Sequence, residues 1–239
     1  MFCYETKDKI RRIFEFLKCR AVKPRNSVPV VFGKLRRPVK IDRCFIFFEL
    51  GCNDFTLAAI GRLNWNRDLS PWETPEIRNN RYSFGGADEY ISELTGGILP
   101  EILSKLPGTP EFTAIAGYSL AGLFALYAAY RTDVFSRVAS VSGSLWFPGF
   151  TEFALSHDFL KNPDCIYLSL GDAEAKTRDK NLATVQKNTE FLAGFYKSRG
   201  IGTIFELNCG NHFTDTIGRT AKGIKKITDT VSGIFHNTI

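Results

Sequence analysis

The sequence predicts an α/β fold: a mostly parallel central sheet flanked by helices on both faces. Apolar runs of strand length alternate along the chain with segments whose apolar residues recur at helical spacing. Several of the runs, such as Arg43–Leu50 (RCFIFFEL), are almost continuously apolar, which is typical of a strand covered on both faces. Strands that alternate with helices indicate βαβ units with right-handed crossovers.

The first part of the chain contains one segment that the pattern leaves open. Residues 5–20 carry Ile10, Ile13, Phe14 and Leu17 at helical spacing, but their β-branched and aromatic content also allows strands. Short strands are expected at 28–32, 43–50 and 55–60. The polar segment 64–72, which holds two of the three tryptophans, is expected to be a loop.

In the rest of the chain, predicted helices alternate with predicted strands. A helical stripe over 88–106 runs through Gly96 and Gly97, and Pro100 is expected to kink or restart it. Strands are expected at 112–116, 137–141, 165–170 and 203–207, with helices at 120–130, from 182 to about 200, and from 217 to 231.

Composition bounds the organisation of the chain. With 239 residues, 44% of them hydrophobic, it can bury a full core as one domain. No linker or charge block divides it, so we expect a single domain over 1–239, with a segment of undetermined structure at 1–42.

Charge and cysteine usage exclude some functions and favour a compartment. The net charge of +6 comes from scattered basic residues without a nucleic-acid motif, so no nucleic-acid partner is expected. Residues 1–20 contain no uninterrupted apolar core, so neither a signal peptide nor a membrane span is expected there. The six cysteines form no Cys-x-x-Cys pair, and free thiols with a cytoplasmic location are predicted.

The most informative stretch is Gly117 to Gly122 (GYSLAG), between a predicted strand and a helix rich in small residues. A serine at a sharp strand-to-helix turn is held in a strained conformation that exposes its hydroxyl. The helix N-terminus behind it offers free N–H groups to an oxyanion. Ser119 is therefore a candidate nucleophile; the alternative is that it only caps the helix.

A serine nucleophile needs a base and a group that orients the base. Of the three histidines, His212 directly follows a predicted strand, at the sheet edge where Ser119 is expected, whereas His157 lies in a polar surface stretch and His236 in the C-terminal tail. His212 is the candidate base. The turn after the strand 165–170 supplies Asp172 and Glu174, and spacing does not choose between them as the acid.

Three segments together resemble the α/β-hydrolase superfamily, in the esterase branch related to esterase D and the enterobactin esterases. They are AIAGYSLAGLFALYAAYRTDVFSRVASVSGSLW (114–146), YLSLGDAEAKTRD (167–179) and NCGNHF (208–213). The loop 66–72 (NRDLSPW) also resembles that branch, and the likeness spans roughly residues 45 to 230. The resemblance implies Ser119 as nucleophile, His212 as base and Glu174 as acid, with Asp172 in reserve. The branch also includes Ser–His dyads, so the absence of an acid stays an alternative.

The resemblance further implies how the oxyanion is held. The first oxyanion donor is expected to be the backbone N–H of Leu120, and the second to come from Gly51–Cys52, most simply Cys52. No metal or organic cofactor is expected. Trp65, Trp72 and Trp146 are candidates for the pocket wall, Trp65 and Trp146 above all, although aromatic residues in a loop can equally form a local packing cluster.

The expected function is a serine esterase that cleaves a small-molecule carboxylic ester through an acyl-enzyme. A thioesterase, peptidase or acyltransferase would use the same groups, because the pocket sets the substrate. A non-catalytic hydrolase-like binding domain is the alternative from another class. The oligomeric state is not indicated by the sequence.

Overall fold

The structure of the protein, a computed structural model, describes residues 2–5, 11–19, 30–33, 55–61, 63–75, 84–106 and 108–229. The predicted strand at 43–50, the expected oxyanion donor Cys52 and the tail histidine His236 lie outside these ranges.

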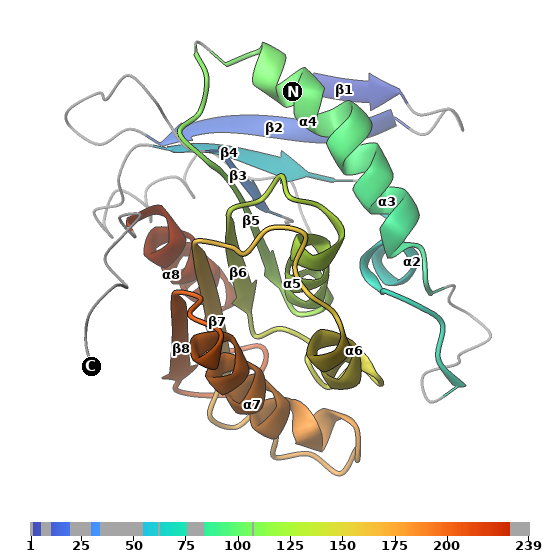
Figure 1. Ribbon diagram of the computed structural model, residues 1–239, viewed down its shortest axis with the longest axis vertical. Helices are drawn as coiled ribbons and strands as arrows, with labels where there is room; N and C mark the ends of the chain where they lie inside the picture. The colour runs from blue at the N-terminus through green and yellow to red at the C-terminus, as the bar shows by residue number, and fades with distance from the viewer. Residues whose placement is uncertain are drawn as a thin grey trace.

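The described strands form one eight-stranded sheet in the order β1-β2-β4-β3-β5-β6-β7-β8 (Figure 1). Every neighbouring pair from β4 to β8 is parallel, whereas β2 pairs antiparallel with both β1 and β4. The mostly parallel sheet is thereby confirmed. The strands are β1 Phe2–Glu5, β2 Arg11–Cys19, β3 Val30–Gly33, β4 Phe55–Ile60, β5 Thr113–Tyr118, β6 Arg137–Val141, β7 Cys165–Gly171 and β8 Thr203–Asn208.

In the segment that the sequence left open between helix and strand, residues 11–19 form a strand. Residues Phe14 to Cys19 of β2 pair in register with Ile60 to Phe55 of β4. This pairing joins residues about forty positions apart in the sequence, so a local pattern of apolar residues does not reveal it.

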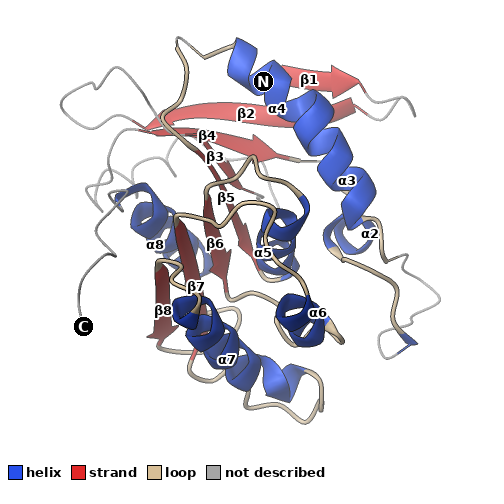
Figure 2. Cartoon of the chain, viewed as in Figure 1, coloured by secondary structure: helices blue, strands red, loops and turns tan. Residues whose placement is uncertain are grey.

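Helices cover both faces of the sheet, as predicted (Figure 2). On one face, α8 (Thr216–Asp229) packs through Ala221, Ile224 and Ile227 against alternate residues of the central strands. The main core lies on the other face, beneath α5 (Leu120–Arg131), α6 (Phe150–Ser156) and α7 (Val185–Ser198). A short 3-10 turn, Leu182–Thr184, leads into α7.

The central helix α5 is buried along nearly its whole length. Every residue from Leu120 to Tyr130 is buried, and only Arg131 at the C-terminal end is exposed. A helix that is apolar on all sides belongs inside a core rather than on a surface. The nucleophile candidate Ser119 immediately precedes this helix and is therefore anchored to the core.

One expectation for the segment before β5 was wrong, and another agrees with the structure. Residues 64–72 are not entirely a loop, because Trp65–Leu69 forms the short helix α2, with the Asn64 side chain accepting from the Arg67 N–H at its start. The expected helical stripe runs through Gly96 and Gly97 as a π-helical turn, Leu94–Ile98, which joins α3 (Ala87–Glu93) to α4 (Leu99–Ser104). The α-helix restarts beside Pro100, as expected. Pro100 lies in the first turn of α4, where a missing N–H is tolerated.

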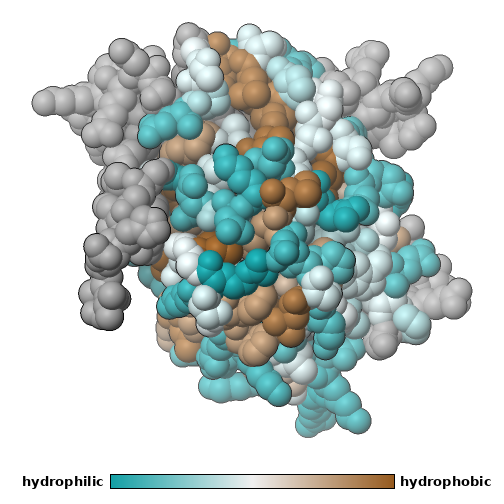
Figure 3. Space-filling model, viewed as in Figure 1, coloured by the Kyte–Doolittle hydropathy of each residue, from teal (hydrophilic) through white to brown (hydrophobic). Residues whose placement is uncertain are grey.

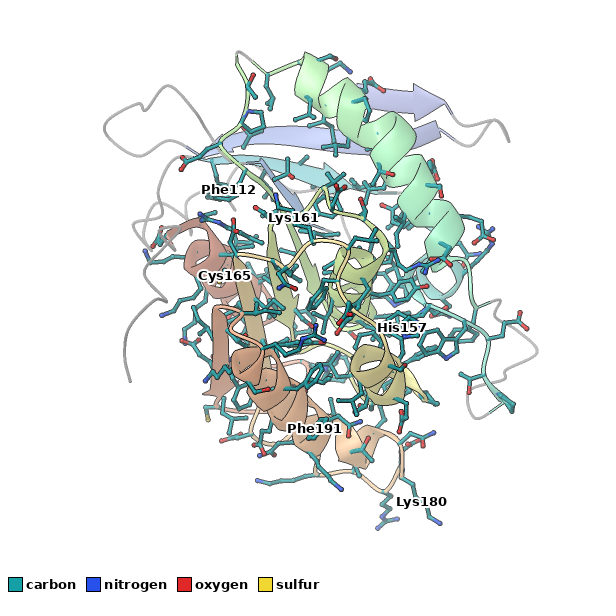
Figure 4. The ribbon with its side chains drawn as sticks, viewed as in Figure 1. Phe112, His157, Lys161, Cys165, Lys180 and Phe191 are labelled. Carbon is teal, nitrogen blue, oxygen red and sulfur yellow. The ribbon has the colours of Figure 1, made fainter. Side chains whose placement is uncertain are left out.

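The surface carries both hydrophilic and hydrophobic residues. In the lower part of the view in Figure 3, hydrophobic surface lies over α7, which carries the half-exposed Phe191 labelled in Figure 4. Within the described part of the chain, no helix has the length and apolar character needed to cross a bilayer.

Candidate active site

Ser119 occupies a strained turn between β5 and α5. Its backbone has φ 61° and ψ −125°, in a region that non-glycine residues rarely adopt. Such a conformation costs about 1–3 kcal/mol and persists only where the surroundings hold it. Here the Ser119 N–H donates to the carbonyl of Val141 at 3.0 Å, and the N–H groups of Gly122 and Ser144 donate to the Ser119 carbonyl at 2.9 and 3.1 Å.

Strand and helix nearly touch on both sides of this turn, so position 117 requires glycine and position 122 leaves little room for a side chain. A Cβ at Gly117 would lie 2.1 Å from the carbonyl oxygen of Ala121, and one at Gly122 would lie 3.0 Å from the carbonyl oxygen of Gly117. The pattern Gly-x-Ser-x-x-Gly in this chain thus reflects a steric requirement.

His212 lies beside Ser119, on the loop that follows β8. Its Nε2 is 3.0 Å from the Ser119 Oγ, although the residues are 93 positions apart. The Tyr118 hydroxyl, at the end of the elbow strand β5, donates to the His212 backbone carbonyl at 2.7 Å. The histidine loop is therefore fastened directly to the strand that carries the serine.

Glu174 completes a hydrogen-bonded series. Its Oε2 is 2.6 Å from His212 Nδ1, and the Glu174 side chain is only 4% exposed. Because a carboxylate only accepts, Nδ1 carries the imidazole proton and Nε2 is left to accept from the serine hydroxyl. Burial raises the pKa of Glu174, but hydrogen bonds from His212, the Gly171 N–H and Ser142 outweigh it, so the pKa lies below its ordinary value.

The reserve acid Asp172 has a different position. Its Oδ1 accepts from the Gly210 N–H at 2.9 Å, and its own N–H donates to the Asn208 carbonyl. Asp172 therefore braces the loop after β8, while Glu174 turns back so that its Oε1 accepts from the Gly171 N–H at 2.7 Å. Of the two carboxylates left open by spacing, the structure brings Glu174 to the imidazole.

Sequence reasoning missed Arg219, a buried residue in the first turns of α8. Its Nη1 lies 3.2 Å from Glu174 Oε1, and its side chain is 3% exposed. The signal was available, since Arg219 falls four positions before Gly223 and eight before Ile227, on the buried face of α8. Arg219 could have been identified as a charged residue at an apolar position of the helix that follows the candidate base.

The backbone N–H of Leu120 is available to an oxyanion. Leu120 is the first residue of α5, and N–H groups in the first turn of a helix have no intrahelical acceptor. No acceptor for this group occurs among the described residues. The second expected donor, Cys52, lies outside the described ranges and stays a prediction.

The candidate pocket residues differ in their surroundings. Trp72 is part of a packing cluster: its ring lies 5.5–6.2 Å from those of Tyr127, Phe147 and Phe153, and its Nε1–H donates to the Pro148 carbonyl. Trp65 is half-buried at the start of α2 and packs against the main core. Trp146 is half-buried five residues beyond the end of β6 and lies beside Phe147. A substrate contact for Trp65 and Trp146 remains a prediction.

Two further residues complete the description of the site. Phe213, which was not singled out from the sequence, has its ring edge-on to His212 at 5.3 Å and is 79% exposed. His157 is exposed, as expected, and lies beside α6 (Figure 4), where its Nδ1 contacts Phe153 and Ser156. It makes no contact of this kind with Ser119 or Glu174. Among the described residues, no cluster of His, Cys, Asp or Glu has the arrangement of a metal site.

Ser119, His212 and Glu174 thus follow three parallel strands at one sheet edge, with the serine on a strained turn at a helix N-terminus. This combination of fold and site defines the class of α/β-hydrolase-fold serine hydrolases. The family model described as "Putative esterase" matches residues 59–197, which is more than half of the chain, and the chain belongs to this family. The protein is accordingly an enzyme of the esterase type.

Solved structures with the same fold include siderophore-processing enzymes. The siderophore hydrolase EstB from Aspergillus nidulans is 20% identical, with a TM-score of 0.71, covering 95% of this chain and 93% of that one. An IroE-like serine hydrolase from Shewanella oneidensis is 18% identical, with a TM-score of 0.75 and coverage of 95% and 79%. The enterobactin esterase FES from Shigella flexneri is 16% identical, with a TM-score of 0.65 and coverage of 95% and 57%. At these identities the likeness shows the fold.

Proposed function

We propose that the protein hydrolyses a small-molecule carboxylic ester through an acyl-enzyme on Ser119. The observation that carries the proposal is the pair of contacts made by His212, 3.0 Å to the Ser119 hydroxyl and 2.6 Å to Glu174. Such a series converts a weak hydroxyl nucleophile into a reactive one.

The reaction follows from the positions of the groups. The Ser119 Oγ attacks the ester carbonyl while His212 Nε2 takes the hydroxyl proton, and Glu174 stabilises the imidazolium that forms. The N–H of Leu120 donates to the oxyanion, with the N–H of Cys52 as the proposed second donor. His212 then passes the proton to the leaving alcohol, and a water molecule that it deprotonates releases the acid and restores Ser119.

The structural neighbours guide the choice of substrate. Several are siderophore hydrolases or enterobactin esterases by their names, so a catecholate trilactone belongs in the first substrate panel beside simple esters. The net charge of +6 is compatible with an anionic substrate. We also propose a cytoplasmic location, since Cys209 is an exposed free thiol of the kind that a reducing compartment preserves.

A panel of activated acyl esters of increasing chain length, with matched thioester and amide substrates, tests this function. We expect ester cleavage by the wild type and its loss in Ser119→Ala and His212→Ala. His157→Ala is the matched control, because it removes an exposed imidazole whose Nδ1 contacts Ser156 and Phe153 of α6. Phosphonate labelling that survives Ser119→Ala would contradict the mechanism, and faster turnover of thioesters or amides would reassign the bond cleaved.

A further inference from the structure

Arg219 joins the two loops that carry the candidate acid and base. Its Nη1 is 3.2 Å from Glu174 Oε1 and 3.1 Å from the carbonyl oxygen of Asn211, and its Nη2 is 2.8 Å from the carbonyl oxygen of Cys209. A fourth, longer contact of 3.4 Å links Nη1 to the Ser142 hydroxyl at the end of β6. One planar guanidinium therefore contacts the segments that follow β6, β7 and β8.

The surrounding backbone leaves space for this guanidinium. A Cβ on Gly171 would lie 2.9 Å from Nη1 and 3.0 Å from Nη2 of Arg219, and 2.3 Å from the Gly210 carbonyl oxygen. Glycine at position 171 thus lets the arginine, the end of β7 and the histidine loop approach one another.

The contacts also determine which carboxylate oxygen faces His212. Glu174 Oε1 accepts from Arg219 and from the Gly171 N–H, so Oε2 is the oxygen that accepts from the imidazole. The guanidinium is 3% exposed and the carboxylate 4%, so each charge compensates the other in a site with little solvent.

We propose that Arg219 is a positioning residue for catalysis: it holds Glu174 and the backbone before His212 in the geometry that aligns the imidazole with Ser119. This inference rests on the proposed ester hydrolysis. Arg219 touches no reacting atom and acts through Glu174 and the histidine loop. Lysine would not replace it, because an ammonium is a point charge without the fixed fork of donors that reaches several acceptors at once.

The chain supplies a matched control in Arg137 of β6. Arg137 is equally buried at 2% exposure, and its Nη1 donates to the Ile227 carbonyl at the other end of α8, at 2.8 Å. Arg137→Met therefore removes a buried guanidinium that holds the same helix, without removing a contact to Glu174 or His212.

The experiment compares kcat, KM and Tm for Arg219→Met, Arg219→Lys and Arg137→Met, each assayed well below its own Tm. A 1 Å misplacement of catalytic groups costs about 10²-fold in rate, so we expect kcat of Arg219→Met to fall by about that factor. KM should change little, since Arg219 touches no substrate. Arg219→Lys keeps the charge and serves if the methionine variant does not fold; we expect its kcat also to fall, by about tenfold or more.

Arg137→Met should lower Tm, because it removes the contact to α8 and the stacking of the guanidinium on the Phe112 ring. Its kcat should stay within about threefold of the wild type, since none of these contacts involves Glu174 or His212. Equal losses of kcat in the Arg219 and Arg137 variants, or unchanged kcat in Arg219→Lys and Arg219→Met, would overturn the inference.

A double-mutant cycle tests whether Arg219 acts through Glu174. If it does, adding Arg219→Met to Glu174→Gln should lower kcat far less than it does in the wild type, because the aligned carboxylate is already lost. Fully additive effects would overturn the inference. Failure of the proposed function is distinguishable, because Ser119→Ala would then retain ester cleavage whatever the Arg219 variants do.

Discussion

Replacing Glu174 by glutamine distinguishes a triad from a Ser–His dyad, and the structure dictates how the new amide must lie. Glu174 Oε1 accepts from two donors, the Gly171 N–H at 2.7 Å and Arg219 at 3.2 Å. The amide oxygen must take that position, so the amide NH₂ faces His212 Nδ1. Nδ1 then becomes an acceptor and the imidazole proton moves to Nε2, which can no longer accept from Ser119.

The size of the effect follows from the cost of the opposite orientation. An amide turned to favour the reactive tautomer would point its NH₂ at two donors. Each unsatisfied buried group costs about 1–3 kcal/mol, so the reactive form lies about 2–6 kcal/mol higher. With about 1.4 kcal/mol per factor of ten, kcat should fall by about 30-fold to about 2 × 10⁴-fold. The corresponding change in a Ser–His–Asp triad of a serine protease lowers kcat by about 10⁴-fold.

The assay is steady-state hydrolysis of an activated acyl ester, with Asp172→Asn as the matched control. Asp172 accepts from the Gly210 N–H through one oxygen, and an asparagine oxygen can do the same, so its kcat should stay within about threefold of the wild type. A Glu174→Gln enzyme within about tenfold of the wild type, a change of less than about 1.4 kcal/mol, would refute the tautomer argument and favour a dyad.

The remaining predictions concern the turn, its glycine and pH. Ser119→Gly should be inactive like Ser119→Ala but more stable than it by about 1 kcal/mol, because glycine adopts φ 61° without strain. Thermal unfolding of the two variants side by side measures this difference in stability. Equal Tm values would argue against strain at this position. Gly117→Ala places a Cβ 2.1 Å from the Ala121 carbonyl oxygen and should cost about 1–3 kcal/mol together with most of the activity. Its control is Gly194→Ala in α7, where nothing lies within 4 Å of the new Cβ and a gain of up to about 1 kcal/mol is expected. The pKa of Glu174 lies below its ordinary value of 4.5, so the ionised carboxylate contributes stability that is present above that pH and is lost as pH falls through the lower folded-state pKa. Tm should therefore decline less steeply below pH 4.5 in Glu174→Gln than in the wild type, and parallel declines would contradict this assignment.

The parallel part of the fold could be predicted because its signals are local. The strands β5 to β8 are short apolar runs, and all of them lie within one or two residues of the predicted bounds. The assignment of β2 depended on distant pairing with β4. The helix α2 was missed because five residues are too few to show a periodic apolar stripe.

Ser119 and His212 could also be predicted from local signals. The sequence left the acid undecided and did not indicate Arg219. Ser119 and His212 both follow predicted strands, and parallel strands bring their carboxyl ends to one edge. The selection between Asp172 and Glu174 depends on the path of a tight turn, in which Glu174 folds back onto the Gly171 N–H. Arg219 lies on α8, which follows the histidine loop in the chain. Its contacts with Glu174 and Cys209 exist only when β7, β8 and α8 are packed together in the fold.

Ser119 and His212, the proposed nucleophile and base, lie in two parts of the molecule with different packing. Ser119 adjoins α5, which is enclosed by the core, whereas Cys209, Asn211 and Phe213 around His212 are exposed. Regions with few buried apolar contacts open at lower free energy than the core around them. Heating or denaturant would therefore detach the imidazole from the hydroxyl while the sheet is still intact, so loss of catalysis reports the opening of one loop rather than the melting of the whole fold.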